Sequence, residues 1–205
     1  MRRVLLGVLG LVLLAGCGAR TAAGGPEIDT APSATSPNPH RPPETTSAVP
    51  EARCSPDGVA ISAVGGDAAM GLRVLTIELV NCGSAPRTVD GYPDLRLYDE
   101  DDRLIDAAVL HGSADISLLP DFDNPPVAIT LQPGEKARSG LLWRNLVTDA
   151  TVDATTATRL EAAPAGGAPW VEVPLVVPNE VTGSSTVTID LGNTGRLGVQ
   201  AWQKA

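Results

Sequence analysis

The sequence predicts an all-β fold over residues 54–205, an antiparallel β-sandwich of immunoglobulin-like type, following a disordered N-terminal stalk. Three observations predict it. Short segments of alternating apolar and polar residues recur from residue 54 onward. Gly, Pro, Asn and Asp clusters separate them about every ten residues, and no long apolar stripe at helical spacing is present. This pattern is typical of two packed antiparallel sheets.

Residues 72–80 show the clearest alternation. One side holds apolar residues and the other polar ones, as in a half-buried strand: Leu75, Ile77 and Leu79 against Thr76 and Glu78. We expect residues 59–64 to form the preceding strand, with Gly65-Gly66-Asp67 as the turn between the two.

The remaining strands follow the same logic. The acidic run 99–102 and the Gln132-Pro133-Gly134 tripeptide are turn signals. Residues 148–158 are ambiguous between strand and loop, because threonine favours both over helix. With the two segments above, the expected strands are residues 95–98, 104–110, 127–131, 139–146, 170–177, 185–191 and 196–202.

The N-terminus resembles a bacterial lipoprotein signal. Arg2-Arg3 precede an apolar run that ends in Leu14-Ala15-Gly16-Cys17, which is similar to a lipobox. This resemblance implies removal of residues 1–16, an acyl (palmitate) anchor on Cys17, and a location on the extracytoplasmic face of the cell membrane. The alternatives are a soluble signal peptide and a membrane span; the run has about a dozen residues, whereas a span needs roughly 20.

Residues 17–53 are predicted to be a disordered linker. They are rich in Pro, Ser and Thr and lack apolar periodicity, so they cannot bury enough surface to offset the entropy of ordering. Such a segment would hold the folded domain away from the membrane.

The cysteine count predicts one disulfide. If Cys17 carries a lipid, Cys54 and Cys82 are left as a pair in an oxidising compartment. Two buried free thiols and a soft-metal pair are the alternatives. A metal site would need further ligands, and the only histidines are His40 and His111.

Composition excludes some partners. The formal net charge is −9, which disfavours nucleic acid and also adsorption to anionic lipid. We therefore expect no nucleic-acid partner, and membrane attachment through the lipid on Cys17 rather than through surface charge.

Chemistry-bearing motifs are scarce. His111 stands alone without a triad motif, so no enzyme and no cofactor are expected. The acidic loops supply weak candidates for a hard cation, although neither fits a calcium-loop pattern: Asp99, Asp101, Asp121 and Asp123.

Aromatic residues are the candidates for binding. Trp143, Trp170 and Trp202 would line a sugar- or lipid-binding face or, as the favoured interpretation, pack in the core. Phe122 is expected to be exposed on its loop and to contact a partner.

Taken in order, several short segments resemble the DUF4232 domain of actinobacterial secreted proteins and lipoproteins over about residues 53–203. They are Cys54, Leu79-Val80-Asn81, Gly91-Tyr92-Pro93, Leu97 to Asp102, Leu131-Gln132-Pro133-Gly134, Leu142-Trp143 and Leu197 to Trp202. The family's function is unknown, so it offers no site residues. One departure is that Thr88 and Val89 stand where the family often has a cysteine before Gly-Tyr-Pro.

These observations favour a non-enzymatic binding or interaction domain, whose partner would be an envelope protein or the cell wall. The alternative is a capture protein that presents a wall glycan, a lipid or a cation at the membrane. Fold class by itself does not choose between them.

Overall fold

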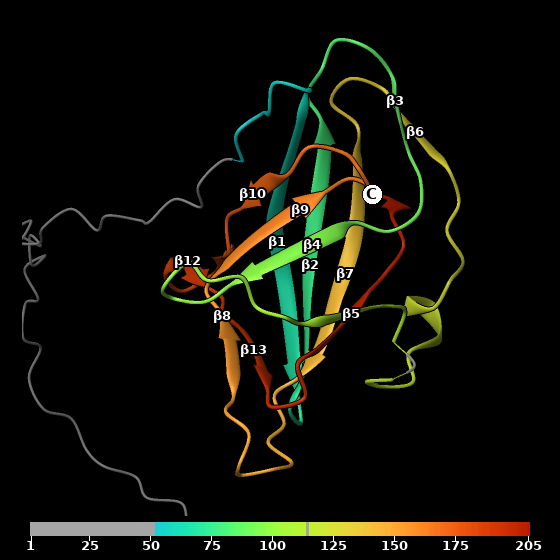
Figure 1. Cartoon of the computed structure of the whole chain (residues 1–205). Helices are drawn as coiled ribbons and strands as arrows, with labels where there is room; N and C mark the ends of the chain where they lie inside the picture. Colours follow the sequence, from blue (N-terminus) through green and yellow to red (C-terminus); the bar gives the residue numbers. More distant parts are fainter. Residues whose placement is uncertain (1–51, 114) are drawn as a thin grey trace, which may run out of the picture. The chain divides into compact units, whose positions relative to one another are not determined.

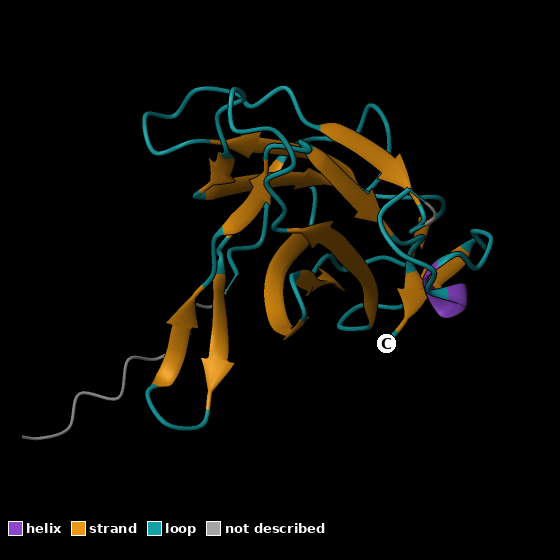
Figure 2. Cartoon of the chain, turned by 90° about the horizontal axis from the view of Figure 1, so that it is seen from below, coloured by secondary structure: helices purple, strands orange, loops and turns teal. Residues whose placement is uncertain are grey.

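A computed structural model describes residues 52–113 and 115–205, all within one compact unit, Glu44–Ala205. The predictions for residues 1–51, including the signal, Cys17 and most of the linker, lie outside the described residues. Within the described part, no helix is long and apolar enough to cross a membrane. The one helix there is the short 3₁₀ helix η1 (Pro120–Phe122), purple in Figure 2.

The described part of the chain is mostly β, as predicted. Its strands are β1 (Val59–Ala69), β2 (Leu72–Asn81), β3 (Arg87–Val89), β4 (Asp94–Tyr98), β5 (Ala108–His111), β6 (Ile129–Leu131), β7 (Lys136–Arg144), β8 (Thr155–Ala157), β9 (Arg159–Ala163), β10 (Val171–Val173), β11 (Val176–Asn179), β12 (Gly183–Thr186), β13 (Ile189–Gly192), β14 (Arg196–Val199) and β15 (Gln203–Lys204).

Two sheets face each other. The larger has six strands in the order β1-β2-β7-β14-β5, with β15 also pairing with β7, and the smaller has the order β10-β9-β4. Figure 1 shows β4, β9 and β10 crossing obliquely over β1, β2 and β7. Three two-stranded pairs complete the described part: β11-β12, β13-β8 and β3-β6.

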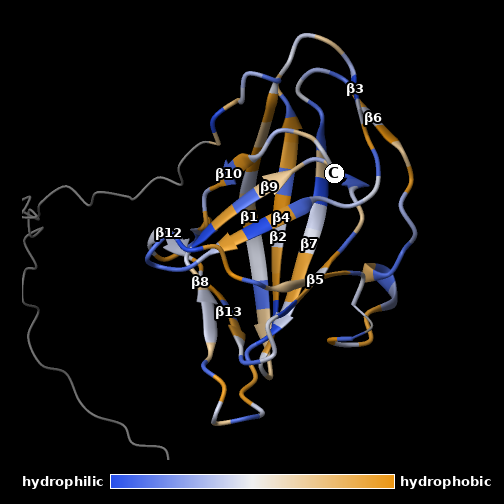
Figure 3. Cartoon of the chain, viewed as in Figure 1, coloured by the Kyte–Doolittle hydropathy of each residue, from blue (hydrophilic) through white to orange (hydrophobic). Residues whose placement is uncertain are grey.

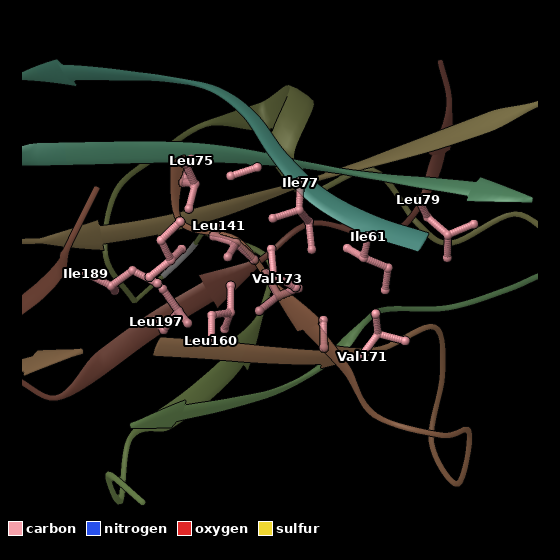
Figure 4. Packing of buried hydrophobic residues seen from close by; sticks show 14 of the residues in the cluster. Ile61, Leu75, Ile77, Leu79, Leu141, Leu160, Val171, Val173, Ile189 and Leu197 are labelled. Carbon is pink, nitrogen blue, oxygen red and sulfur yellow. The ribbon is translucent and has the colours of Figure 1, made fainter. Parts of the chain in front are cut away.

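The core fills the space between these sheets. Ile77 and Leu141 project from the large sheet toward Leu160 and Val173 of the small one, and none of the four is more than 2% exposed (Figure 4). The alternation predicted for residues 72–80 is therefore the core-facing pattern of β2. Aliphatic side chains of this kind each contribute roughly 1.5–3 kcal/mol by full burial.

The prediction of a turn at Gly65-Gly66-Asp67 is wrong. The strand β1 continues through it with a register shift between Ala63 and Gly65, and pairs with β2 as far as Ala69. Glycine suits the bulge because a Cβ at Gly66 would lie 2.7 Å from the Val74 carbonyl oxygen. The actual turn is Met70-Gly71.

Strand pairing differs from the expectation in two further ways. The strand β5 is shorter than predicted and pairs in parallel with β14, whereas all the other strand pairs of the described part are antiparallel. The segments 170–177 and 185–191 each divide into two short strands, and β9 was not predicted at all.

Candidate functional site

The predicted disulfide is present. Cys54 and Cys82 are joined with their Cα atoms 6.3 Å apart and close a segment of 28 residues. The bond ties the chain just before β1 to the end of β2, where the Cys82 amide also donates to the Gly58 carbonyl at 3.0 Å. It therefore braces one end of the large sheet, and both cysteines are exposed.

The tryptophans divide into two groups. Trp143 and Trp202 are each 2% exposed and belong to the core, as favoured above. The Trp202 indole N–H donates to the Pro164 carbonyl at 2.7 Å, while the buried indole N–H of Trp143 has no partner. Trp170 is half-buried, with the Arg96 guanidinium 4.0 Å from its ring centroid. The three rings thus form no shared binding face.

The prediction of an exposed Phe122 is wrong. Its side chain is 7% exposed, at the end of η1, and packs on the outer face of the large sheet. The space comes from Gly140 of β7, where a Cβ would lie 2.6 Å from the Phe122 ring. Phe122 is therefore a packing residue and is not available to a partner.

The acidic candidates have structural partners. The Asp123 carboxylate accepts from the backbone N–H and the hydroxyl of Ser113, the latter at 2.8 Å, and so ties these two residues together. Asp99 accepts from two backbone amides of its turn and from Arg103. These hydrogen bonds, above all that from the Arg103 backbone, lower the pKa of Asp99.

The other two acidic candidates are also held by contacts within the protein. Asp101 pairs with Arg103 at 2.8 Å, and the backbone carbonyl of Asp121 accepts from Gln200. Across residues 52–113 and 115–205, no three His, Cys, Asp or Glu side chains gather as a metal site would require. His111 is exposed and stacks on Tyr92, with ring centroids 3.8 Å apart.

A buried carboxylate on the outer face of the large sheet pairs with two exposed cations. Glu78 is 4% exposed and accepts from Lys136 at 2.6 Å and from Arg138 at 2.8 Å. Burial alone would raise the pKa of Glu78, but the hydrogen bonds and charges of the two cations hold it below its ordinary value. The sequence pattern predicts that Glu78 lies on a polar face, but it does not predict the ion pairs with Lys136 and Arg138.

One exposed apolar surface lies at the opposite end of the large sheet from the disulfide. It comprises Met70, Leu146, Val147 and Val152, which we call the apolar end. The backbone N–H of Asn145 donates to the Gly71 carbonyl at 3.0 Å and so joins the β1–β2 turn to the loop after β7. Figure 3 shows hydrophobic stretches in that loop.

Met70 is unusual within the apolar end. It is 92% exposed and has a φ of 48°, followed by Gly71 with a φ of 80°. Positive φ at both central residues is the geometry of a type I′ hairpin turn, in which Asn-Gly is preferred. Methionine therefore carries a backbone cost and an exposed apolar side chain at the same position.

Carboxylates border this surface. Asp149 and Asp153 lie in the loop that supplies Val147 and Val152, and Asp67 lies near the end of β1. The sequence analysis does not identify these apolar residues as a binding surface. It predicts the hairpin turn at Gly65–Asp67 instead of at Met70-Gly71, and it leaves the segment 148–158 ambiguous. The sequence feature that could have indicated this turn is Met70-Gly71 between two segments of alternating apolar residues.

The fold and its surface define a disulfide-bonded β domain with an apolar end bordered by carboxylates. The chain belongs to the family described as Domain of unknown function (DUF4232), whose model matches residues 54–203. Neither the curated proteins nor the solved structures compared with the chain contain a match.

Proposed function

We propose that this chain is a cell-envelope lipoprotein whose β domain, an immunoglobulin-like sandwich, binds another envelope protein without catalysis. The lipid on Cys17 would hold it on the extracytoplasmic face of the cell membrane, with residues 18–53 as a tether. The lipobox-like Leu14-Ala15-Gly16-Cys17 supports the anchor, and the Cys54–Cys82 disulfide agrees with an oxidising compartment.

Met70 carries the binding part of the proposal. An exposed methionine in a left-handed turn position contributes nothing to the core and strains the backbone. Flexible, polarizable Met side chains are well suited to contact surfaces. The neighbouring apolar residues extend the contact, and the bordering carboxylates favour a partner with an apolar spot flanked by basic side chains.

The test compares Met70→Asn with Val181→Asn. Both side chains are 92% exposed, but Val181 lies at the β11–β12 turn, outside the apolar end. Each full-length variant is crosslinked in cells, and the crosslinked proteins are identified by mass spectrometry. We expect Met70→Asn to lose a discrete partner that Val181→Asn retains.

Stability separates contact from folding in this test. Asn-Gly suits a type I′ turn, so Met70→Asn should leave the domain as stable as the parent or more stable. Loss of the partner without loss of stability would support the proposal, and an unchanged partner set would overturn it. Membrane retention of a Cys17→Ala variant would contradict the anchor alone.

The alternative, capture of a small ligand, is favoured by one specific observation. Trp143, Val177 and Val187 contribute to the lining of one hollow. A ligand with an apolar body suits such a lining.

A further inference from the structure

A second hollow lies beside the apolar end, on the outer face of the large sheet. Its charged lining consists of Arg144 at the end of β7, Arg196 at the start of β14, and Asp115. Its volume is about 450 Å³. The rest of the lining consists of Ile116, Leu146, Thr148 and Thr194. We call it the arginine hollow.

The two arginines lie on neighbouring strands at the same end of the large sheet. The strands β7 and β14 pair with Gly198 opposite Leu142. Continuing this register by two residues would place Arg196 opposite Arg144. Like charges at directly opposed positions destabilise a sheet.

Among the described residues, Asp115 is the only carboxylate in the lining of the hollow, and it forms no ion pair with either arginine. In the described part of the chain, no carboxylate lies within 4.0 Å of either guanidinium in an ion pair. With one aspartate in the lining, the hollow carries a formal excess of positive charge, although the whole chain has a net charge of −9. Arg138 and Arg103, by contrast, pair with Glu78 and Asp99.

The protein backbone positions one of these guanidiniums. The Arg144 Nε–H donates to the Ile116 carbonyl at 2.9 Å. The segment that carries Ile116 approaches the sheet closely because Gly198 has no side chain: a Cβ there would lie 2.5 Å from the Gly112 carbonyl oxygen. Arg144 is half-buried as a result, while Arg196 is exposed.

The opposite wall is equally constrained. The Leu146 carbonyl accepts from the Asn193 amide at 3.1 Å, and Gly192 packs against Leu146 with a φ of 58°. Thr148 is held nearby through its backbone N–H, which donates to the Asn193 side chain at 2.9 Å. The hollow is thus preformed between two fixed segments.

We propose that the arginine hollow binds an organic oxyanion, a phosphate or carboxylate head with an apolar body. Planar guanidinium groups pair with both kinds of head through two parallel hydrogen bonds. Ile116 and Leu146 offer the apolar body a surface. An anionic membrane fits less well, because Asp149 lies in the same loop as Leu146 and Thr148.

The test titrates the full-length chain, in a neutral detergent, with phenyl phosphate, benzoate, inorganic phosphate and benzyl alcohol by calorimetry. We expect phenyl phosphate or benzoate to bind more tightly than inorganic phosphate and benzyl alcohol, and the tighter of the two identifies the head group. Equal binding of the neutral alcohol, or no binding of either aromatic anion, would overturn the proposal.

Arg196→Gln and Arg53→Gln form the matched pair. Both arginines are exposed, and Arg53 adjoins Cys54 at the other end of the sheet. Loss of one guanidinium should weaken binding about tenfold or more, with partial recovery in Arg196→Lys. An equal loss in Arg53→Gln would overturn the assignment. This inference does not require the protein partner proposed above, since it is measured without one.

Discussion

The two core tryptophans allow one prediction to be worked through in detail. Trp143 and Trp202 are equally buried and both belong to the same core. Replacing either with phenylalanine removes a similar amount of buried ring. They differ in the indole N–H, which donates to the Pro164 carbonyl from Trp202 and has no partner in Trp143.

The difference in stability follows from this hydrogen bond. In Trp202→Phe the buried Pro164 carbonyl loses its donor, which costs about 1–3 kcal/mol beyond the loss of ring. In Trp143→Phe an unsatisfied donor disappears, which offsets the loss of ring by about the same amount. We expect Trp202→Phe to be less stable than Trp143→Phe by about 2–6 kcal/mol.

Urea unfolding followed by far-ultraviolet circular dichroism measures this difference without depending on tryptophan emission. The midpoints should separate while the slopes stay equal, because both variants expose the same surface on unfolding. Equal midpoints would refute the reasoning. Such a result would mean that water or a shifted side chain satisfies the Trp143 indole in solution.

The remaining predictions concern charge and covalent structure. The double substitution of Cys54 and Cys82 with serine should lower the free energy of unfolding by about 3–4 kcal/mol, measured in urea, because the bond closes a 28-residue segment. Glu78 has a lowered pKa in the folded state, so its contribution is complete above the unfolded value and is lost as pH falls below about 4.5. Glu78→Gln should therefore flatten the acid side of a stability–pH curve; an unchanged slope would contradict this. Arg196→Thr should raise the stability of the unliganded domain by about 0.2–1 kcal/mol in thermal unfolding, since it removes a like-charge cross-strand pair, and a lower stability would argue against that pairing.

The sequence predicts what is local. The alternation at residues 72–80 corresponds to β2, because one side of that strand packs on the core. The Pro133-Gly134 turn is also found, with Gly134 at a φ of 82° and the Glu135 amide donating to the Gln132 carbonyl. The disulfide was predicted from the cysteine count together with the assignment of Cys17 to the lipid.

Features set by distant residues were not predictable. The sequence of β9, Arg-Leu-Glu-Ala-Ala, has little intrinsic β preference, and pairing with β4 and β10 on its two sides makes it a strand. The burial of Phe122 depends on Gly140, and that of Glu78 depends on Arg138 directly opposite it in β7. No local pattern records these contacts.

The candidate sites are the places where local rules are broken without compensation. Glu78 and Asp123 are unfavourable in isolation, yet each is satisfied by its neighbours. Met70 in its left-handed turn and the two arginines that share the arginine hollow are not satisfied in this way. Both features lie at the same end of the large sheet. The backbone N–H of Asn145, just after β7, donates to the Gly71 carbonyl beside Met70, and β7 pairs with β14, where Arg196 lies. Because consistent local choices are the rule in stable folds, two uncompensated departures at one end make this end the first place to test the proposed binding, ahead of the acidic loops.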